Sequence, residues 1–149
     1  MSISKKCIYA LRAIFELSLR GGSEPVKINK IADAQDIPPR FLEVILNQLK
    51  HAGYVDSRRG KEGGYILSYN PQDLTVSKII EAVQGPIGKK TGKELKTGKQ
   101  SPRRGDYAFT QMWESARKAV SSIYGNTSFS DLIELDKAGR QPCIVNYAI

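Results

Sequence analysis

Apolar residues recur at intervals of three and four from Ser4 to Arg20, which predicts an amphipathic helix. Ser4 can cap its N-terminus, and Gly21–Gly22 can end it. The apolar positions of this helix are Ile8, Leu11, Ile14, Phe15 and Leu19. Charged residues interrupt the segment at helical intervals, so it is predicted to be an amphipathic helix rather than an apolar leader. They are Lys5, Lys6, Arg12, Glu16 and Arg20.

Two further helices are predicted on either side of a short turn. Residues 28–34 carry a small apolar face, residues 36–38 form the turn, and residues 39–51 form the next helix. Pro39 suits the first position of a helix, because its missing N–H would have no partner there. The predicted apolar face of the third helix is Phe41, Leu42, Ile45, Leu46 and Leu49, with Arg40, Glu43, Asn47 and Lys50 on the other faces.

A basic segment punctuated by glycine follows these helices, at residues 57–68 with the sequence SRRGKEGGYILS. Its three glycines permit a tight turn and close approach of the backbone to a partner. Strands are predicted at residues 54–55 and 65–67. We interpret the segment as a β-hairpin wing attached to a helix-turn-helix, and the alternative is an ordinary solvated hairpin.

Capping residues and helix stop signals in the second half of the chain predict three more helices. Thr75 is placed to cap a helix that begins at Val76 and ends at Gly85–Pro86, and Asp106 begins a long helix to Tyr124. The S-x-x-D pattern at residues 128–131 predicts a last helix through Leu135, followed by a short strand at 143–149.

The long predicted helix has a wide apolar stripe. Its members are Phe109, Met112, Trp113, Ala116, Val120, Ile123 and Tyr124. One small domain cannot easily cover such a stripe, so we expect two copies of the helix to pair about a two-fold axis. Packing within one chain is the simpler alternative. The predicted organisation is a domain at 1–87, a basic flexible loop at 88–105, and a dimerisation helix with its tail at 106–149.

Composition narrows the class of protein. The 149 residues are 40% hydrophobic without an apolar run long enough to span a membrane, and we expect a cytoplasmic protein with no membrane partner. Two cysteines and one histidine provide neither a disulfide framework nor a thiolate metal cage. The chain also lacks a phosphate-binding loop and a nucleophile–histidine–carboxylate set, so an enzyme is the least favoured class.

The net charge of +8 indicates a polyanionic partner, but its distribution qualifies that inference. The segment from Gly88 to Arg104 contains seven basic residues and one acidic residue, so it carries +6 of the net charge. A charge run of this kind is usually a solvated segment, and contact between this loop and DNA is the alternative.

The ordered motifs resemble the Rrf-two (Rrf2) family of bacterial winged-helix transcription regulators. The resemblance rests on IPPRFLEVILNQLKHAGYV at 37–55, on RGKEGGYIL at 59–67, which matches the pattern RGxxGGYxL, and on VSKIIEAVQGPI at 76–87. It implies a mainly α fold with a small β-hairpin wing (α+β), and a homodimer joined by the helix from Asp106. It also implies a repressor that reads a pseudo-palindromic operator in double-stranded DNA.

In this resemblance the third helix enters the major groove and the wing enters the minor groove. Arg40 is expected at guanine or phosphate and Glu43 at cytosine N4, with an exposed Arg40–Glu43 ion pair as the alternative. Arg59 is the expected minor-groove residue. The full set of expected DNA-binding residues is Lys27, Pro39, Arg40, Glu43, Asn47, Arg58, Arg59, Gly60 and Lys61.

The chain departs from cluster-binding members of the family in its loop at 88–105. Those members carry three cysteines there and in some cases an acidic ligand in the first helix, at the position of Ile8 here. We therefore expect no iron–sulfur cluster and no metal. Cys7 and Cys143 are candidates for a redox pair, but a cysteine among apolar neighbours is more often a packed side chain.

The input signal stays open at this stage: a small-molecule effector of unknown identity, a regulatory protein partner, or none. The main alternative function is a winged-helix interaction module that regulates a partner enzyme.

Overall fold

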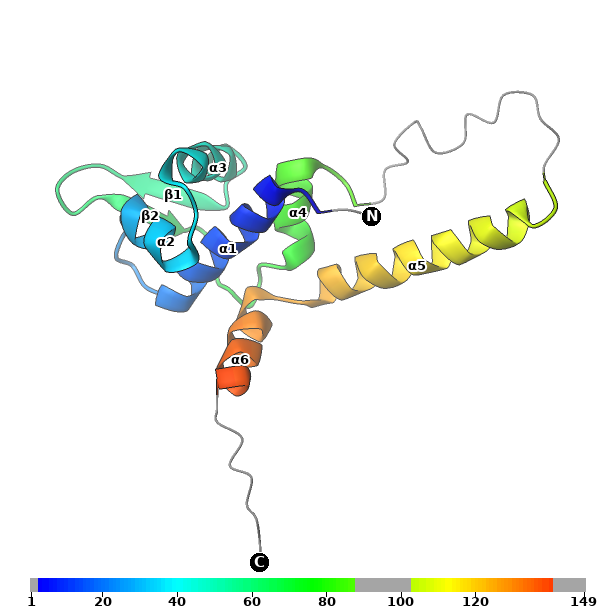
Figure 1. The fold of residues 1–149 in the computed structure, drawn as a ribbon. Coiled ribbons are helices and arrows are strands. Elements are labelled where there is room, and N and C mark those ends of the chain that lie inside the picture. Colours follow the sequence, from blue (N-terminus) through cyan, green and yellow to red (C-terminus); the bar gives the residue numbers. More distant parts are fainter. Residues whose placement is uncertain (1–2, 88–102, 141–149) are drawn as a thin grey trace, which may run out of the picture.

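The computed structural model describes residues 3–87 and 103–140, and it is mainly helical with one two-stranded antiparallel sheet (Figure 1). This is the predicted fold class. The elements are α1 (Lys5–Arg20), α2 (Ile28–Gln35), α3 (Pro39–His51), β1 (Val55–Arg58), β2 (Gly64–Leu67), α4 (Val76–Gln84), α5 (Asp106–Asn126) and α6 (Phe129–Arg140). The loop at 88–102 and the tail at 141–149, which contains Cys143 and the strand predicted there, lie outside the described residues. No helix of the described part is both long and apolar enough to cross a membrane.

Helix α1 is the centre around which the others pack. Its N-terminus is capped as predicted, since the Ser4 hydroxyl accepts a hydrogen bond of 3.2 Å from the Cys7 amide. The buried side of α3 presents Leu42, Ile45, Leu46 and Leu49 to the same core as α1. Phe41 was predicted on that side, but its side chain is 63% exposed, because it lies at the edge of the apolar face, away from the core.

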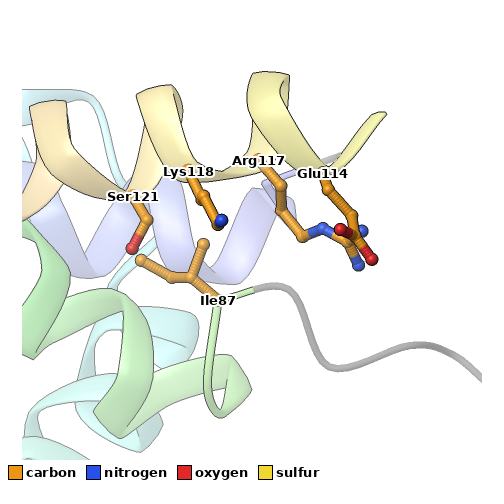
Figure 2. A pocket seen from close by; sticks show the side chains of 5 residues that line it. All are labelled: Ile87, Glu114, Arg117, Lys118 and Ser121. Carbon is orange, nitrogen blue, oxygen red and sulfur yellow. The ribbon is translucent and has the colours of Figure 1, made fainter. Parts of the chain in front are cut away.

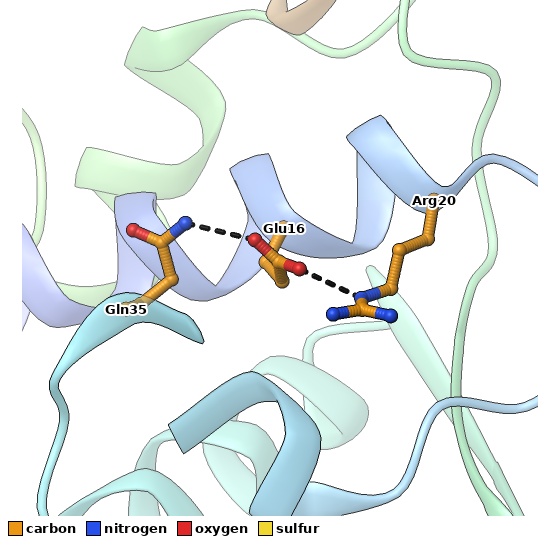
Figure 3. A network of polar contacts seen from close by, with 3 residues as sticks. All are labelled: Glu16, Arg20 and Gln35. Atoms are coloured by element: carbon orange, nitrogen blue, oxygen red, sulfur yellow. Dashed lines mark hydrogen bonds and ion pairs between the residues drawn. The ribbon is translucent and has the colours of Figure 1, made fainter. Parts of the chain in front are cut away.

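A buried carboxylate joins α1 to α2 (Figure 3). Glu16 is 5% exposed, and its two oxygens accept hydrogen bonds from Arg20 Nε at 2.7 Å and from Gln35 Nε2 at 2.9 Å. Both oxygens therefore have partners, which offsets the cost of removing the carboxylate from water. The bond to Gln35 fixes the last residue of α2, immediately before the turn of the helix-turn-helix.

The wing is a hairpin of β1 and β2 with Val55 opposite Leu67 and Arg58 opposite Gly64. Its first strand begins one residue later than predicted, because Tyr54 is still hydrogen-bonded by its amide to the Leu49 carbonyl at the end of α3. A third segment joins the hairpin: Val26 and Tyr65 exchange two backbone hydrogen bonds of 2.8 Å. The connector before α2 is thus tied to the second wing strand.

The last helix, α6, packs against the first helix, α1. Ser128 and Asp131 form the predicted capping box, with the Ser128 amide donating to the carboxylate at 2.8 Å and the Asp131 amide donating to the Ser128 hydroxyl at 3.1 Å. Bonds from the Ser128 amide and hydroxyl lower the pKa of Asp131. Phe129 is fully buried in the core that contains α1 and α3. Helix α6 ends at Arg140, five residues beyond the predicted end at Leu135.

Thr75 does not cap α4 as predicted. It occupies the N-cap position, but its side chain makes no capping bond, and its hydroxyl lies 3.1 Å from the Ser77 hydroxyl instead. The Val76 amide donates to the Thr127 carbonyl at 2.9 Å, so the chain before α6 satisfies a donor in the first turn of α4.

Helix α5 extends away from the remainder of the described chain (Figure 1). It contains no buried residue and ends two residues beyond the predicted Tyr124. Tyr124 belongs to the end of α5 that contacts α4, where it is partly buried against Val76 and Ile80.

Candidate nucleic-acid interface

The wing and the beginning of α2 enclose a shallow basic hollow. Its volume is about 420 Å³, and the residues that line it include Lys27, Arg58, Arg59 and Lys61. The Val26–Tyr65 backbone pairing places Lys27 beside the hairpin. Four of the expected DNA-binding cations are therefore gathered on one surface, although Lys27 is distant from the others in sequence.

Two glycines allow the backbones to approach so closely. A Cβ at Gly64 would overlap the Val26 carbonyl group, and a Cβ at Gly63 would overlap the carbonyl oxygen of Arg58. Gly60 has φ +111°, a conformation that side chains with a Cβ rarely adopt. Each glycine of the RGxxGGYxL pattern thus has a steric reason within the chain itself.

The beginning of α2 adds backbone donors to this hollow. Lys27 is its N-cap residue, and no side chain caps the helix there. Amide groups in the first turn of a helix lack partners within the helix, and the helix dipole makes this end attractive to anions. Ile28 and Asn29 line the same hollow as the wing cations. The combination is suited to a phosphate group.

Helix α3 presents its opposite side to solvent. Arg40, Glu43 and Asn47 are all exposed, as is Pro39 at its start. Arg40 and Glu43 form no ion pair within 4.0 Å in the part of the chain that the structure describes, so the alternative interpretation of these two residues as a surface pair finds no support. Their polar groups remain free to bind a partner.

A side-chain contact links α3 to the wing. Lys50 Nζ donates a hydrogen bond to the Ser57 hydroxyl on β1. On its buried side, Gln48 donates to the carbonyls of Ala82 and Val83 at 2.9 and 3.3 Å, which fixes α3 against α4. The helix and the first strand of the hairpin therefore adjoin each other.

Two residues of this surface were missed from the sequence. Val44 is 58% exposed on α3, and Phe41 was assigned to the core. The spacing Arg40–Val44–Asn47 would have placed Val44 among the exposed residues, because positions separated by three and four share a helix face. The helical pattern also does not signal the burial of Glu16, because its partner Gln35 is distant in sequence.

The apolar stripe of α5 forms a second exposed surface. Its large side chains are Phe109, Met112, Trp113 and Ile123, with Trp113 62% exposed. Ala116 is also exposed, whereas Val120 is half-buried. Contiguous apolar surface of this kind on a soluble helix marks an interaction site.

The opposite side of α5 faces the end of α4 and is polar. A hollow of about 400 Å³ lies there between Ile87 and the helix. Figure 2 shows Ser121, Lys118, Arg117 and Glu114 on the side of α5 towards Ile87. The exposed members of the stripe, Phe109, Met112, Trp113, Ala116 and Ile123, are therefore directed away from the chain's own core.

The side chains of residues 3–87 and 103–140 do not provide a donor set that fits an iron–sulfur cluster or another metal centre. Such clusters are held by thiolates, with histidine as an occasional substitute. Cys7 is fully buried, and burial raises the pKa of its thiol, which favours the protonated and unreactive form. Within residues 3–87 and 103–140, no three histidine, cysteine or acidic side chains are grouped so that they could hold a metal ion.

Comparison with known proteins gives one consistent result. Residues 3–135 match the family model described as "Rrf2: Iron-dependent Transcriptional regulator". The transcriptional regulator CymR of Bacillus subtilis is 31% identical over 132 residues, which cover 89% of each chain. The transcriptional regulator IscR of Cereibacter sphaeroides is 31% identical over 145 residues, which cover 96% of this chain and 92% of the relative.

The fold agrees with the sequence match. The solved structure of B. subtilis CymR, described as the global cysteine regulator of that organism, superposes with a TM-score of 0.78 and 30% identity, covering 91% of this chain and 98% of the other. These relatives are transcription regulators, not enzymes. The winged helix, the glycine pattern of its wing and the family match together show that the chain belongs to the Rrf2 family of DNA-binding transcriptional regulators.

Proposed function

We propose that the protein is a homodimeric repressor that binds a pseudo-palindromic operator in double-stranded DNA. The observation that carries this proposal is the basic hollow between the wing and α2, which adjoins the exposed side of α3. A helix of this size fits the major groove, and a neighbouring basic hairpin then reaches the flanking backbone and minor groove. Binding at a promoter would exclude other proteins from the same DNA.

The residues divide by the DNA groups that suit them. Lys27 and the first amides of α2 suit a phosphate, which would fix the position of the helix-turn-helix on the backbone. Arg40 can contact guanine or phosphate, Glu43 can accept from cytosine N4, and Asn47 can contact bases or backbone. Arg59 is assigned to the minor groove, where negative potential is concentrated, and the neighbouring Arg58, Gly60 and Lys61 to the adjoining backbone.

A second copy of the chain is the proposed occupant of the apolar stripe on α5. The exposed side chains of the stripe are directed away from the core. Pairing of two copies of α5 about a two-fold axis would bury the same side chains of both copies. Its proposed interface residues are Phe109, Met112, Trp113, Ala116, Val120 and Ile123. Residues 1–87 then provide the DNA-binding unit, and residues 106–149 provide dimerisation.

We propose that the protein acts in the cytoplasm without an iron–sulfur cluster. The description of the family names iron, but this chain has only two cysteines and one histidine, and Cys7 is buried. The input is a small-molecule effector, a regulatory protein or no effector at all, and residues 88–105 are the proposed place for either of the first two. Cys7 is better explained as a packed side chain than as a redox sensor.

The test is DNA binding measured against salt. Operator DNA recovered by genome-wide pull-down from the native host should bind with an affinity that falls steeply as salt rises, because phosphate contacts release counterions. Arg59→Ala should weaken binding about tenfold or more and reduce sequence preference in the flanking minor groove, as expected for an arginine that reads the DNA. Fluorescence anisotropy over a salt series measures both effects.

Arg140→Ala is the matched control, since Arg140 is an exposed arginine on α6 whose ion pair among the described residues is with Asp136, at 2.9 Å. It should leave operator affinity unchanged. A folded Arg59→Ala dimer with unchanged affinity would show that the minor-groove assignment is wrong. A wild-type protein that binds a partner protein tightly but shows no salt-sensitive DNA binding would instead favour the interaction module.

A further inference from the structure

The DNA-facing side of α3 has an apolar centre. Val44 is 58% exposed, although it lies on a helix that buries its other aliphatic residues Leu42, Ile45, Leu46 and Leu49 completely. Its polar or charged neighbours on the exposed side of the helix are Arg40, Glu43 and Asn47, and the aromatic Phe41 is exposed beside it. Nothing in the described chain packs over Val44 to explain an aliphatic side chain at this place.

Helix geometry places Val44 near the middle of that side. Residues three or four positions apart share a helix face, so Arg40, Val44 and Asn47 form one row. The buried residues occupy the opposite side, against α1 and α4. Phe41 is also exposed and lies three positions before Val44, so it adjoins Val44 on the flank of the helix nearer the core. A helix that enters a groove along its exposed side therefore brings Val44 to the floor of the groove, between two polar side chains.

The major groove offers one apolar group to such a side chain. Base edges there present hydrogen-bond donors and acceptors, and the exception is the C5-methyl group of thymine. A valine can bury its methyl groups against that methyl, but it can form no hydrogen bond with any other base edge. Polar edges opposite Val44 would lose water without gaining a partner, which disfavours the other bases.

We propose that Val44 reads a thymine methyl group in each half of the operator. The proposal rests on the DNA-binding function proposed above and deepens it, by naming a specificity-determining residue and the chemical group that it recognises. Arg40 and Asn47 on either side position the helix, and Val44 selects thymine at the base pair below it.

Deoxyuridine provides the test, because it differs from thymidine only in the missing methyl group. Each thymine of an operator half-site is replaced in turn by deoxyuridine, and dissociation constants are measured by fluorescence anisotropy. For wild-type protein, one position should weaken binding about fourfold, the value for losing about 0.8 kcal/mol of methyl burial. Other positions outside the reach of α3 should be insensitive.

Val44→Ala should bind the natural operator several-fold more weakly and should lose most of the sensitivity at that position, because its shorter side chain contacts the thymine methyl group less closely. Val44→Thr retains a methyl group and should keep part of the sensitivity to deoxyuridine. Leu135→Ala is the control, since Leu135 is an equally exposed aliphatic residue on α6 and should leave the deoxyuridine profile unchanged.

Two results would overturn the proposal: a half-site in which no thymine is sensitive to loss of its methyl group, or a Val44→Ala variant that keeps the full sensitivity. Failure of the proposed function looks different. In that case wild-type protein would not bind the natural operator in a salt-sensitive manner at all, whereas failure of the Val44 assignment leaves that binding intact.

Discussion

At the scale of single residues, the wing depends on positions where no side chain is present. Gly64 lies against the Val26 backbone, where a Cβ would overlap the carbonyl group. That close approach allows Val26 and Tyr65 to pair, and the pairing sets Lys27 beside Arg58 and Arg59. The glycines were predicted from the sequence as turn residues. Their role in holding a third segment was not predicted, because the partner lies in a connector without a strand pattern.

Gly64→Ala should separate the connector from the wing. The added methyl group forces Val26 or β2 to move, and we expect a cost of about 1–3 kcal/mol, as for overpacking in a well-packed site. Chemical denaturation measures the free energy of unfolding, and DNA affinity should fall in the fraction that stays folded.

Gly139→Ala is the control for this change, because a Cβ at Gly139 meets nothing within 4 Å. Inside a helix the substitution should stabilise slightly. Equal stability and DNA affinity of Gly64→Ala and wild type would refute the role assigned to this glycine.

The helical pattern of the sequence does not give the burial of two residues, Glu16 and Phe41. Glu16 has the spacing of a solvated charge, yet it is buried with both oxygens bonded. Phe41 has the spacing of a core residue, yet it is exposed at the edge of the apolar face. Periodicity assigns a residue to a side of its helix, but only the packing of neighbouring helices decides how far the buried zone extends.

At the scale of elements, local signals predicted most of the helices. Helix α3 was predicted at residues 39–51 from a proline at its first position and an unbroken apolar face, and the structure has the same bounds, Pro39–His51. The end of α6 was missed because its last turns have no apolar stripe. Exposed ion pairs lie there instead, between Lys137 and Glu134 and between Arg140 and Asp136, and such pairs support a helix only weakly.

Helix α5 is predicted to need a second copy to cover its stripe. Trp113→Ala should raise the dissociation constant of the dimer about 30-fold, since a large aromatic side chain at the centre of an interface contributes about 2 kcal/mol or more. The fold of each chain should be unaffected, because α5 contains no buried residue. Sedimentation equilibrium measures the association, and circular dichroism measures the fold.

Lys118→Ala on the opposite side of α5 is the matched control, and it should leave association unchanged. A monomeric wild-type protein at concentrations where it binds operator DNA would contradict the pairing of α5.

At the scale of the whole molecule, the base of α5 is fixed to the DNA-binding unit. The Val76 amide bonds to the Thr127 carbonyl, the Phe129 amide bonds to the Leu74 carbonyl at 3.0 Å, and Phe129 is buried in the core. Contacts between residues so distant in sequence leave no local pattern, so the sequence separated these parts at residue 88. Helix α6 packs against α1, and in a dimer the orientation of α5 would set the distance between the two wings.

The most direct measurement is hydroxyl-radical footprinting of the protein on its operator, because the radical attacks deoxyribose from the minor groove. A dimer with two fixed wings should protect two equivalent sets of sugars related by the operator's two-fold axis, with half-site centres roughly one helical turn or a multiple of it apart. Arg59→Ala should lose protection at the outer sugars of both halves. A single asymmetric protected patch, or protection without regard to sequence, would contradict the central claim that a symmetric dimer reads the operator.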